Sequence, residues 1–174
     1  MKLETDRLIL RELTMNDVDA LYEILSDPMS MQHYPQPFTR EKTTEWITWN
    51  LENYKTYGFG LWAVVLKETN LFIGDCGITM QNIDGSLEPE IGYHINKTHT
   101  GKGYATEAAR ACRNYAFDVL GLKTMYSYMK YINRASQRVA EKNDMKRVAE
   151  LPDEKNGITT VYAITLEEYL SLKK

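Results

Sequence analysis

The chain has 174 residues, of which 43% are hydrophobic and 26% are charged, a balance typical of one globular domain spanning residues 1–174. A formal net charge of −3 without a basic stripe argues against nucleic acid as a partner. No apolar run is long enough to span a membrane, and no export signal is evident, so we expect a cytoplasmic protein without a membrane partner. Cys76 and Cys112 are too few for a disulfide framework, which predicts two reduced thiols in the core.

The first half of the chain changes from helical to extended patterns near Gly58. Thr14 and Asp17 have the spacing of a capping box and predict the start of a helix. The expected elements, in order, are a strand at 7–13, a helix at 14–25, an aromatic loop at 29–38, a helix from Thr39 to near Gly58, and a β-hairpin of strands at 61–66 and 71–80.

The second half alternates strands and helices. The expected elements are a turn-rich loop at 81–88, a strand at 90–95, a glycine loop at 101–106 leading into a helix that ends at Gly121, a strand at 122–132, a helix from Asn133 to about Lys142, a strand at 158–166 and a short tail helix. Hairpins followed by strand–helix–strand order favour an α+β domain with a mixed sheet over a regular doubly wound one.

The glycine loop is the most informative segment. Gly101 and Gly103 lie between a predicted strand and a predicted helix rich in small residues. Free backbone N–H groups and the dipole at a helix N-terminus bind anions, and glycine lets a phosphate approach the backbone closely. On spacing alone, an ordinary tight turn before a helix explains the loop equally well. The fingerprints of P-loop and dinucleotide-binding proteins do not fit, because Asn96 and Thr106 stand where glycines are needed.

Five segments in the right order resemble the GNAT superfamily of N-acetyltransferases, in the branch of the ribosomal-protein enzymes RimJ and RimL. They are T-D-R-L-I-L-R at 5–11, I-G-D-C-G-I at 73–78, E-I-G-Y at 90–93, G-K-G-Y-A-T-E-A at 101–108 and N-R-A-S-Q-R-V-A-E-K-N-D-M-K at 133–146. The resemblance implies a bent, mixed and largely antiparallel β-sheet flanked by helices and splayed at the acyl-CoA site. It also implies transfer of acetyl from acetyl-CoA to a primary amine, either a protein N-terminal α-amine or a small-molecule amine, by direct attack on the thioester.

The resemblance also implies where acetyl-CoA would bind. The strand before the glycine loop would offer backbone N–H groups to the pantetheine arm and the thioester oxygen, and the loop would hold the pyrophosphate. The implied cofactor residues are Tyr93, His94, Ile95, Gly101, Lys102, Gly103, Tyr104, Ala105, Thr106, Asn133 and Ser136. The near-neutral net charge suggests that oriented amides, more than a basic surface, hold the phosphates. The chain departs from the family pattern at Thr100, Ala140 and Asp144, and Ala140 replaces the tyrosine thought to protonate the leaving thiolate.

An alkyl amine is mostly protonated at pH 7, so the reaction needs a base. Glu90 is the preferred candidate and His94 the rival, since strand alternation places both on one face. Ser136 is a candidate proton donor to the thiolate, and Asn133 and Ser136 also suit helix capping. His33, Tyr34 and Phe38 are candidates for the acceptor site. The spacing of the three histidines predicts no metal site.

Two other interpretations remain open. The departures at Thr100 and Ala140 are compatible with a non-catalytic acyl-CoA-binding sensor of the same fold, and the glycine loop alone is compatible with an unrelated nucleotide-binding domain. A homodimer is possible, although no stripe of residues in the sequence indicates one.

Overall fold

The computed structural model describes residues 2–153 and 157–174. The strands in this part of the chain are β1 (Lys2–Glu4), β2 (Leu8–Glu12), β3 (Leu61–Leu66), β4 (Phe72–Ile83), β5 (Ser86–Ile95), β6 (Thr124–Lys130), β7 (Lys146–Asp153) and β8 (Gly157–Thr165). The α-helices are α1 (Val18–Leu25), α2 (Arg40–Tyr57), α3 (Tyr104–Asp118), α4 (Arg134–Lys142) and α5 (Leu166–Ser171). No helix in this part of the chain is long and apolar enough to cross a membrane.

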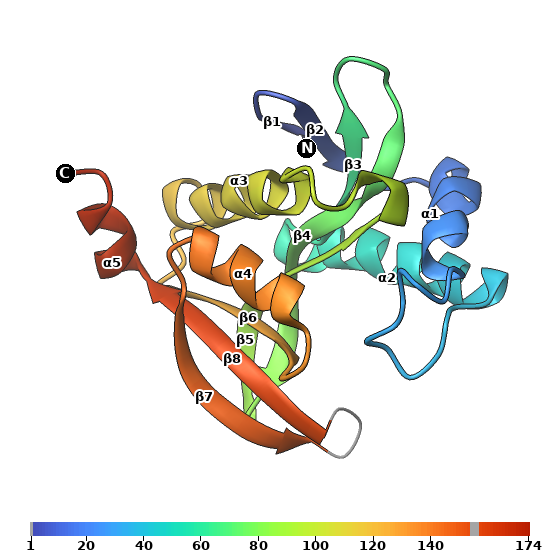
Figure 1. Cartoon of the computed structure of the whole chain (residues 1–174). Helices are drawn as coiled ribbons and strands as arrows, with labels where there is room; N and C mark the ends of the chain where they lie inside the picture. The colour runs from blue at the N-terminus through green and yellow to red at the C-terminus, as the bar shows by residue number, and fades with distance from the viewer. Residues whose placement is uncertain (1, 154–156) are drawn as a thin grey trace.

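The eight described strands form one sheet in the order β1-β2-β3-β4-β5-β6-β8-β7. Neighbours pair antiparallel except β5 and β6, which are parallel and are in register only at Glu90 and Tyr126. A parallel pair needs a crossover, which here runs through the glycine loop and α3 (Figure 1). Beyond Glu90, β5 has no register partner on the β6 side. The predicted α+β fold, with a mixed and largely antiparallel sheet splayed between two strands, is confirmed.

Helices cover both faces of the sheet: α3 and α4 lie on one and α1 and α2 on the other (Figure 1). The larger core lies under α3, where Ala108, Cys112 and Ala116 pack against apolar residues of the central strands. Cys76 and Cys112 are both buried with their Sγ atoms 3.7 Å apart, which confirms the prediction of two core thiols. The central strands that carry the glycine loop are therefore anchored in a packed core.

The predicted loop at 81–88 is wrong. Strand β4 continues to Ile83 and β5 begins at Ser86, so the connection is the two-residue turn Asp84-Gly85. Both residues have positive φ, 51° and 84°, which is the geometry that favours Asp-Gly in a tight hairpin. The long β4–β5 hairpin follows from this turn, and it pairs β5 with β4 along its whole length, as far as Ile95 opposite Gly74.

The edge strands β1 and β7 are not among the elements expected from the sequence. Strand β1 has only three residues, and β7 contains four charged residues and Pro152. Short strands, charges and proline are devices that protect sheet edges, and they remove the alternating apolar pattern on which strand prediction depends.

Candidate active site

A cavity of about 620 Å³ lies between the C-terminal end of β5, the glycine loop and α4. All the predicted cofactor residues line it except Lys102, and of the predicted acceptor residues His33 and Tyr34 line it. The remaining lining residues are Met29, Ser30, Gln32, Lys97, His99, Thr100, Ala135, Arg138, Val139 and Lys142. Three segments far apart in the sequence thus meet at the place where β5 loses its partner strand.

The glycine loop forms an open helix N-terminus. Gly101 and Gly103 have φ of 75° and 85°, a left-handed conformation that glycine adopts without strain. Gly103 is the N-cap of α3 and offers no side-chain cap to the first amides of the helix. A Cβ on Gly101 would meet no protein atom within 4 Å, so the space beside the loop is open. These amides, together with the helix dipole, suit a phosphate group.

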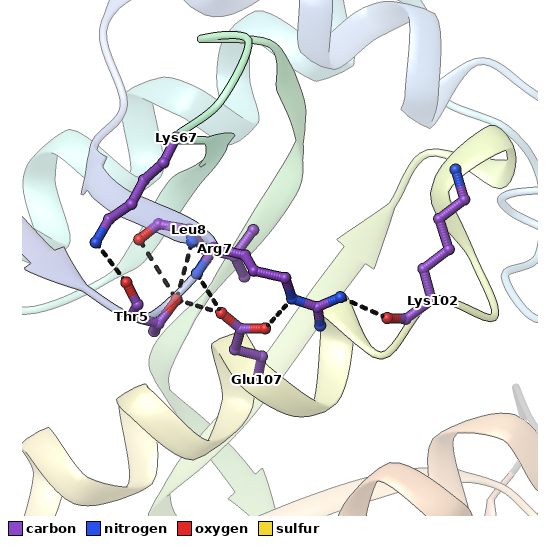
Figure 2. A network of polar contacts seen from close by, with 6 residues as sticks. All are labelled: Thr5, Arg7, Leu8, Lys67, Lys102 and Glu107. Atoms are coloured by element: carbon purple, nitrogen blue, oxygen red, sulfur yellow. Dashed lines mark hydrogen bonds and ion pairs between the residues drawn. The ribbon is translucent and has the colours of Figure 1, made fainter.

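Arg7 connects the glycine loop to the N-terminal strands (Figure 2). Its Nη1 donates to the Lys102 carbonyl at 3.0 Å, and its Nε donates to Glu107 Oε2 at 2.7 Å. Its guanidinium also lies 4.4 Å from the centre of the Tyr104 ring. Glu107 Oε1 accepts from the Arg7 backbone N–H and from the Thr5 hydroxyl. The first segment of the family pattern therefore buttresses the loop, and Lys102 contributes a carbonyl to this network.

Replacing Arg7 with glutamine is expected to weaken acetyl-CoA binding about tenfold, or about 1.4 kcal/mol. The variant leaves the Lys102 carbonyl and the Glu107 carboxylate without the guanidinium that fixes them, so the loop must be ordered by the ligand. Isothermal titration calorimetry measures the change. Lys2→Gln, which removes an exposed ion pair with Glu4 on the same N-terminal segment, is the matched control. Equal affinities of the two variants would contradict the buttressing role of Arg7.

The backbone of β5 presents two amides to the open edge. The His94 N–H donates to Asp75 Oδ1 at 3.0 Å, and the Asn96 N–H donates to the Ile73 carbonyl, so both face β4. Neighbouring N–H groups along a strand face opposite edges, which directs those of Tyr93 and Ile95 toward the gap before β6. Of the three amides predicted to serve the thioester and pantetheine, that of His94 has a protein partner, and those of Tyr93 and Ile95 face the gap.

Glu90 lies on the same face of β5 as Gly92 and His94, as the alternation predicts, but it does not line the cavity. Its side chain is buried at the start of the splay, where the Tyr128 backbone N–H and the Thr79 hydroxyl hydrogen-bond to it. Burial raises the pKa of Glu90 to about 8, and these two hydrogen bonds oppose the rise. The carboxyl is therefore mostly protonated at pH 7. Its role as the base stays a prediction.

His94 is held by a buried carboxylate. Its Nδ1 lies 2.8 Å from Asp75 Oδ1, and the other oxygen of Asp75 accepts from the Trp46 indole N–H at 3.2 Å. Asp75 is completely buried. The His94 ring lies 5.1 Å from the Tyr34 ring, centre to centre. Asp75 therefore positions the His94 ring.

The first turn of α4 carries the residues predicted for the pantetheine arm. Asn133 is the N-cap of α4, and its Oδ1 accepts from the Ser136 backbone N–H at 3.2 Å, so the capping role is observed. Both residues also line the cavity. Ala140 is buried in the core and brings no hydroxyl to the site.

The acceptor residues separate into two groups. His33 and Tyr34 line the cavity, whereas Phe38 packs edge-on against Trp46, 5.5 Å between ring centres, in the core under α2. Burial, and to a lesser degree the positive charge of Lys130, lower the pKa of His33. The structure thus places Phe38 outside the cavity, as a partly buried residue packed against the core.

Three cations that were not predicted as site residues line the cavity: Lys97, Arg138 and Lys142. Lys97 pairs with Asp27, at 2.6 Å, and the other two are exposed. No carboxylate is among the described residues that line the cavity. Besides the oriented amides expected from the sequence, these cations are therefore available to the phosphates. Arg138 and Lys142 are four residues apart on a predicted helix, and this spacing is the sequence signal that they share one helix face.

A splayed mixed sheet with a glycine loop at a helix N-terminus and a cavity in the splay is the architecture of an acyltransferase that uses an acyl-CoA donor. Residues 7–146 match the acetyltransferase (GNAT) domain, and the chain belongs to this family. It is an acetyltransferase, and the resemblance seen in the sequence is confirmed.

Relatives and solved structures agree with this assignment. The chain is 42% identical to YkkB of Bacillus subtilis over 83% of this chain and 84% of that protein, and 32% identical to the N-acetyltransferase YnaD of the same organism over 84% of both. A GNAT-family acetyltransferase from Bacillus anthracis has a TM-score of 0.82 at 30% identity, with 97% of this chain and 100% of that chain covered. RimL in complex with coenzyme A shares the fold, with a TM-score of 0.81 at 16% identity over 97% of this chain and 99% of that chain.

The described residues contain no cluster of three or more His, Cys, Asp or Glu side chains suited to a metal ion.

Proposed function

We propose that this protein transfers the acetyl group of acetyl-CoA to a primary amine by direct attack of the amine on the thioester. The observation that carries the proposal is the cavity itself, which joins an open helix N-terminus, the free edge of β5 and the first turn of α4. The coenzyme A complex of RimL, a protein with the same fold, supports the choice of donor.

Each part of the cavity has a chemical role in the proposal. The amides of Gly103 to Thr106 hold the pyrophosphate, and those of Tyr93 and Ile95 donate to the pantetheine arm and to the thioester oxygen, where negative charge develops. Ser136 offers a proton to the thiolate. A thiolate with a pKa near 8.5 leaves readily, so the missing tyrosine at Ala140 is tolerable. His33 and Tyr34 mark the side from which the amine enters.

The proposal is tested first by binding and then by turnover. Calorimetry with acetyl-CoA is expected to show binding in the micromolar range, and no binding in the low-millimolar range would exclude the proposal. A panel of peptides with free α-amines, polyamines and aromatic amines, assayed by detection of free thiol, then identifies the acceptor. Binding without turnover across the panel would indicate the acyl-CoA sensor instead.

Gly101→Ala is expected to weaken acetyl-CoA binding at least tenfold, because the added methyl group occupies the open space where a phosphate approaches the loop. Gly85→Ala is the matched control. Gly85 has a similar φ, 84° against 75°, and a Cβ added there would also meet no atom within 4 Å, but it lies in the β4–β5 turn. Both variants carry the same backbone strain, so an equal loss of affinity would show that strain alone is responsible.

A further inference from the structure

The polar cluster behind the cavity is centred on Asp75. This residue lies opposite His94 in the β4–β5 register and is completely buried. Its carboxylate accepts from the His94 backbone N–H and the Trp46 indole, and its Oδ1 lies 2.8 Å from Nδ1 of the His94 ring. A buried carboxylate is costly unless such partners compensate its charge. Its two oxygens are thus fixed in place from β5 on one side and from α2 on the other.

This arrangement determines which ring nitrogen of His94 carries a proton. An ionised carboxylate only accepts hydrogen bonds, so Nδ1 is protonated, and in the neutral ring the lone pair is on Nε2. Nε2 is buried and has no hydrogen-bond partner among the described residues. A buried acceptor without a partner destabilises the fold, and such atoms call for a ligand or a function. His94 lines the cavity, so a group bound there is the natural partner.

We propose that Asp75 and His94 form a proton-accepting dyad in which Nε2 of His94 takes the proton of the attacking amine and Asp75 is the positioning residue. The inference rests on the proposed function and assigns a role to Asp75, whose second oxygen is held by Trp46. The dyad selects His94 over Glu90 as the base.

Proton transfer precedes formation of the new bond. An ammonium group gives one proton to Nε2, and the freed nitrogen lone pair bonds to the thioester carbon. The carbon–sulfur bond then breaks, and its electron pair leaves with sulfur. The nitrogen loses a second proton to become a neutral amide. The thiolate takes up one of the two released protons, and the other passes to solvent.

Geometry separates His94 from Glu90. The two residues are four positions apart on β5, which is about 13 Å along the strand. Glu90 lies outside the cavity and is held by Tyr128 and Thr79, whereas His94 lines the cavity. A carboxyl that is mostly protonated at pH 7 also has little capacity to accept another proton. Of the two candidate bases, the imidazole of His94 is the one that lines the cavity and has a ring nitrogen without a protein partner among the described residues.

Nuclear magnetic resonance tests the dyad without any acceptor. The chain has only three histidines, so long-range nitrogen–proton spectra of the imidazole rings can be assigned with His33→Gln and His94→Gln variants. The expected result is an Nδ1-protonated ring for His94 with a strongly downfield Nδ1 proton, lost in Asp75→Asn. Asp84→Asn, in the exposed turn, is the matched control. An Nε2-protonated His94 in the wild-type protein would overturn the proposal.

Kinetics with the fastest amine of the panel provide the second readout. His94→Gln is expected to lower kcat at least 100-fold. Asp75→Asn leaves the ring without its positioning partner, so kcat is expected to fall while the KM for acetyl-CoA stays unchanged. The titratable side chains against the ring are Asp75 from β4 and Tyr34 from the segment after α1, while Trp46 from α2 does not titrate.

The outcomes distinguish this proposal from the proposed function. An unchanged kcat in Asp75→Asn, or a larger loss of turnover in Glu90→Gln than in His94→Gln, would overturn the dyad while acetyl transfer stands. A protein that binds acetyl-CoA but acetylates no amine would overturn the proposed function. In that case the imidazole spectra still decide whether Asp75 orients His94.

Discussion

Replacing both Arg138 and Lys142 with glutamate is expected to weaken acetyl-CoA binding about 100-fold at low salt, or about 2.7 kcal/mol. Both side chains line the cavity from one face of α4, opposite the glycine loop. The phosphates of coenzyme A must be neutralised in that space, and no carboxylate among the described lining residues competes for these two cations. The double variant turns two attractions into two repulsions.

Folding should tolerate this change. Both residues are exposed, and glutamate is as good a helix former as lysine or arginine. A negative charge in the last turn of α4 costs about 0.3–1 kcal/mol against the helix dipole. The matched control is Lys42→Glu with Lys55→Glu on α2, which changes the net charge equally, from −3 to −7, because two cations become two anions.

The salt dependence of acetyl-CoA binding shows how much of the difference between the two double variants is electrostatic. Calorimetry at low salt should show the full difference between the two double variants, and the difference should shrink near 1 M salt, where the Debye length is about 3 Å. Equal binding by both double variants at low salt would mean that the amides of the glycine loop hold the phosphates without help from α4.

Local signals in the sequence were sufficient to predict much of the fold. The capping box of Thr14 and Asp17 and the left-handed C-cap at Gly58 are both present, because each depends on residues within one turn of the chain. The Asp84-Gly85 turn is also a local signal, but the polar residues around it favour a loop over the observed hairpin. The edge strand β1 is too short, at three residues, to give a periodic signal, and the residues of β7 lack alternation.

The site was predictable as a set of residues but not as a set of contacts. The family motifs placed the cofactor residues near one another, and the cavity gathers all of them except Lys102. The contacts of Arg7 with Glu107 join residues 100 positions apart, and those of Asp75 with His94 depend on the β4–β5 register. Neither can be read from spacing in one sequence, since both arise only when the strands are paired.

Replacing Glu90 with glutamine is expected to stabilise the protein progressively as the pH rises. In the wild-type protein, burial raises the pKa of this carboxyl from 4.5 to about 8. Below pH 4.5 the group is protonated in both the folded and the unfolded state, so its ionisation contributes nothing. Between pH 4.5 and 8 the unfolded carboxyl is ionised while the folded one keeps its proton. The free energy of unfolding therefore falls by about 1.4 kcal/mol per pH unit over this range and is constant above it.

Glutamine has nearly the same shape and never ionises, so Glu90→Gln removes this pH dependence. The difference in the free energy of unfolding between the variant and the wild-type protein should grow by about 3 kcal/mol from pH 4.5 to pH 7. Urea denaturation followed by circular dichroism at each pH measures it. Glu88→Gln, which removes a half-buried carboxylate two residues along β5, is the matched control for the loss of one negative charge.

The sign of this result is diagnostic. The carboxylate could instead be ionised in the folded protein, held by the Tyr128 amide and ready to accept a proton. The difference in the free energy of unfolding would then fall or stay level as the pH rises, and Glu90 would be the preferred base. A difference that grows toward pH 8 means that the folded protein keeps a neutral carboxyl at the start of the splay. In that case Glu90 fills the gap between β5 and β6 as a hydrogen-bonding wedge, and the proton of the amine must go elsewhere in the cavity.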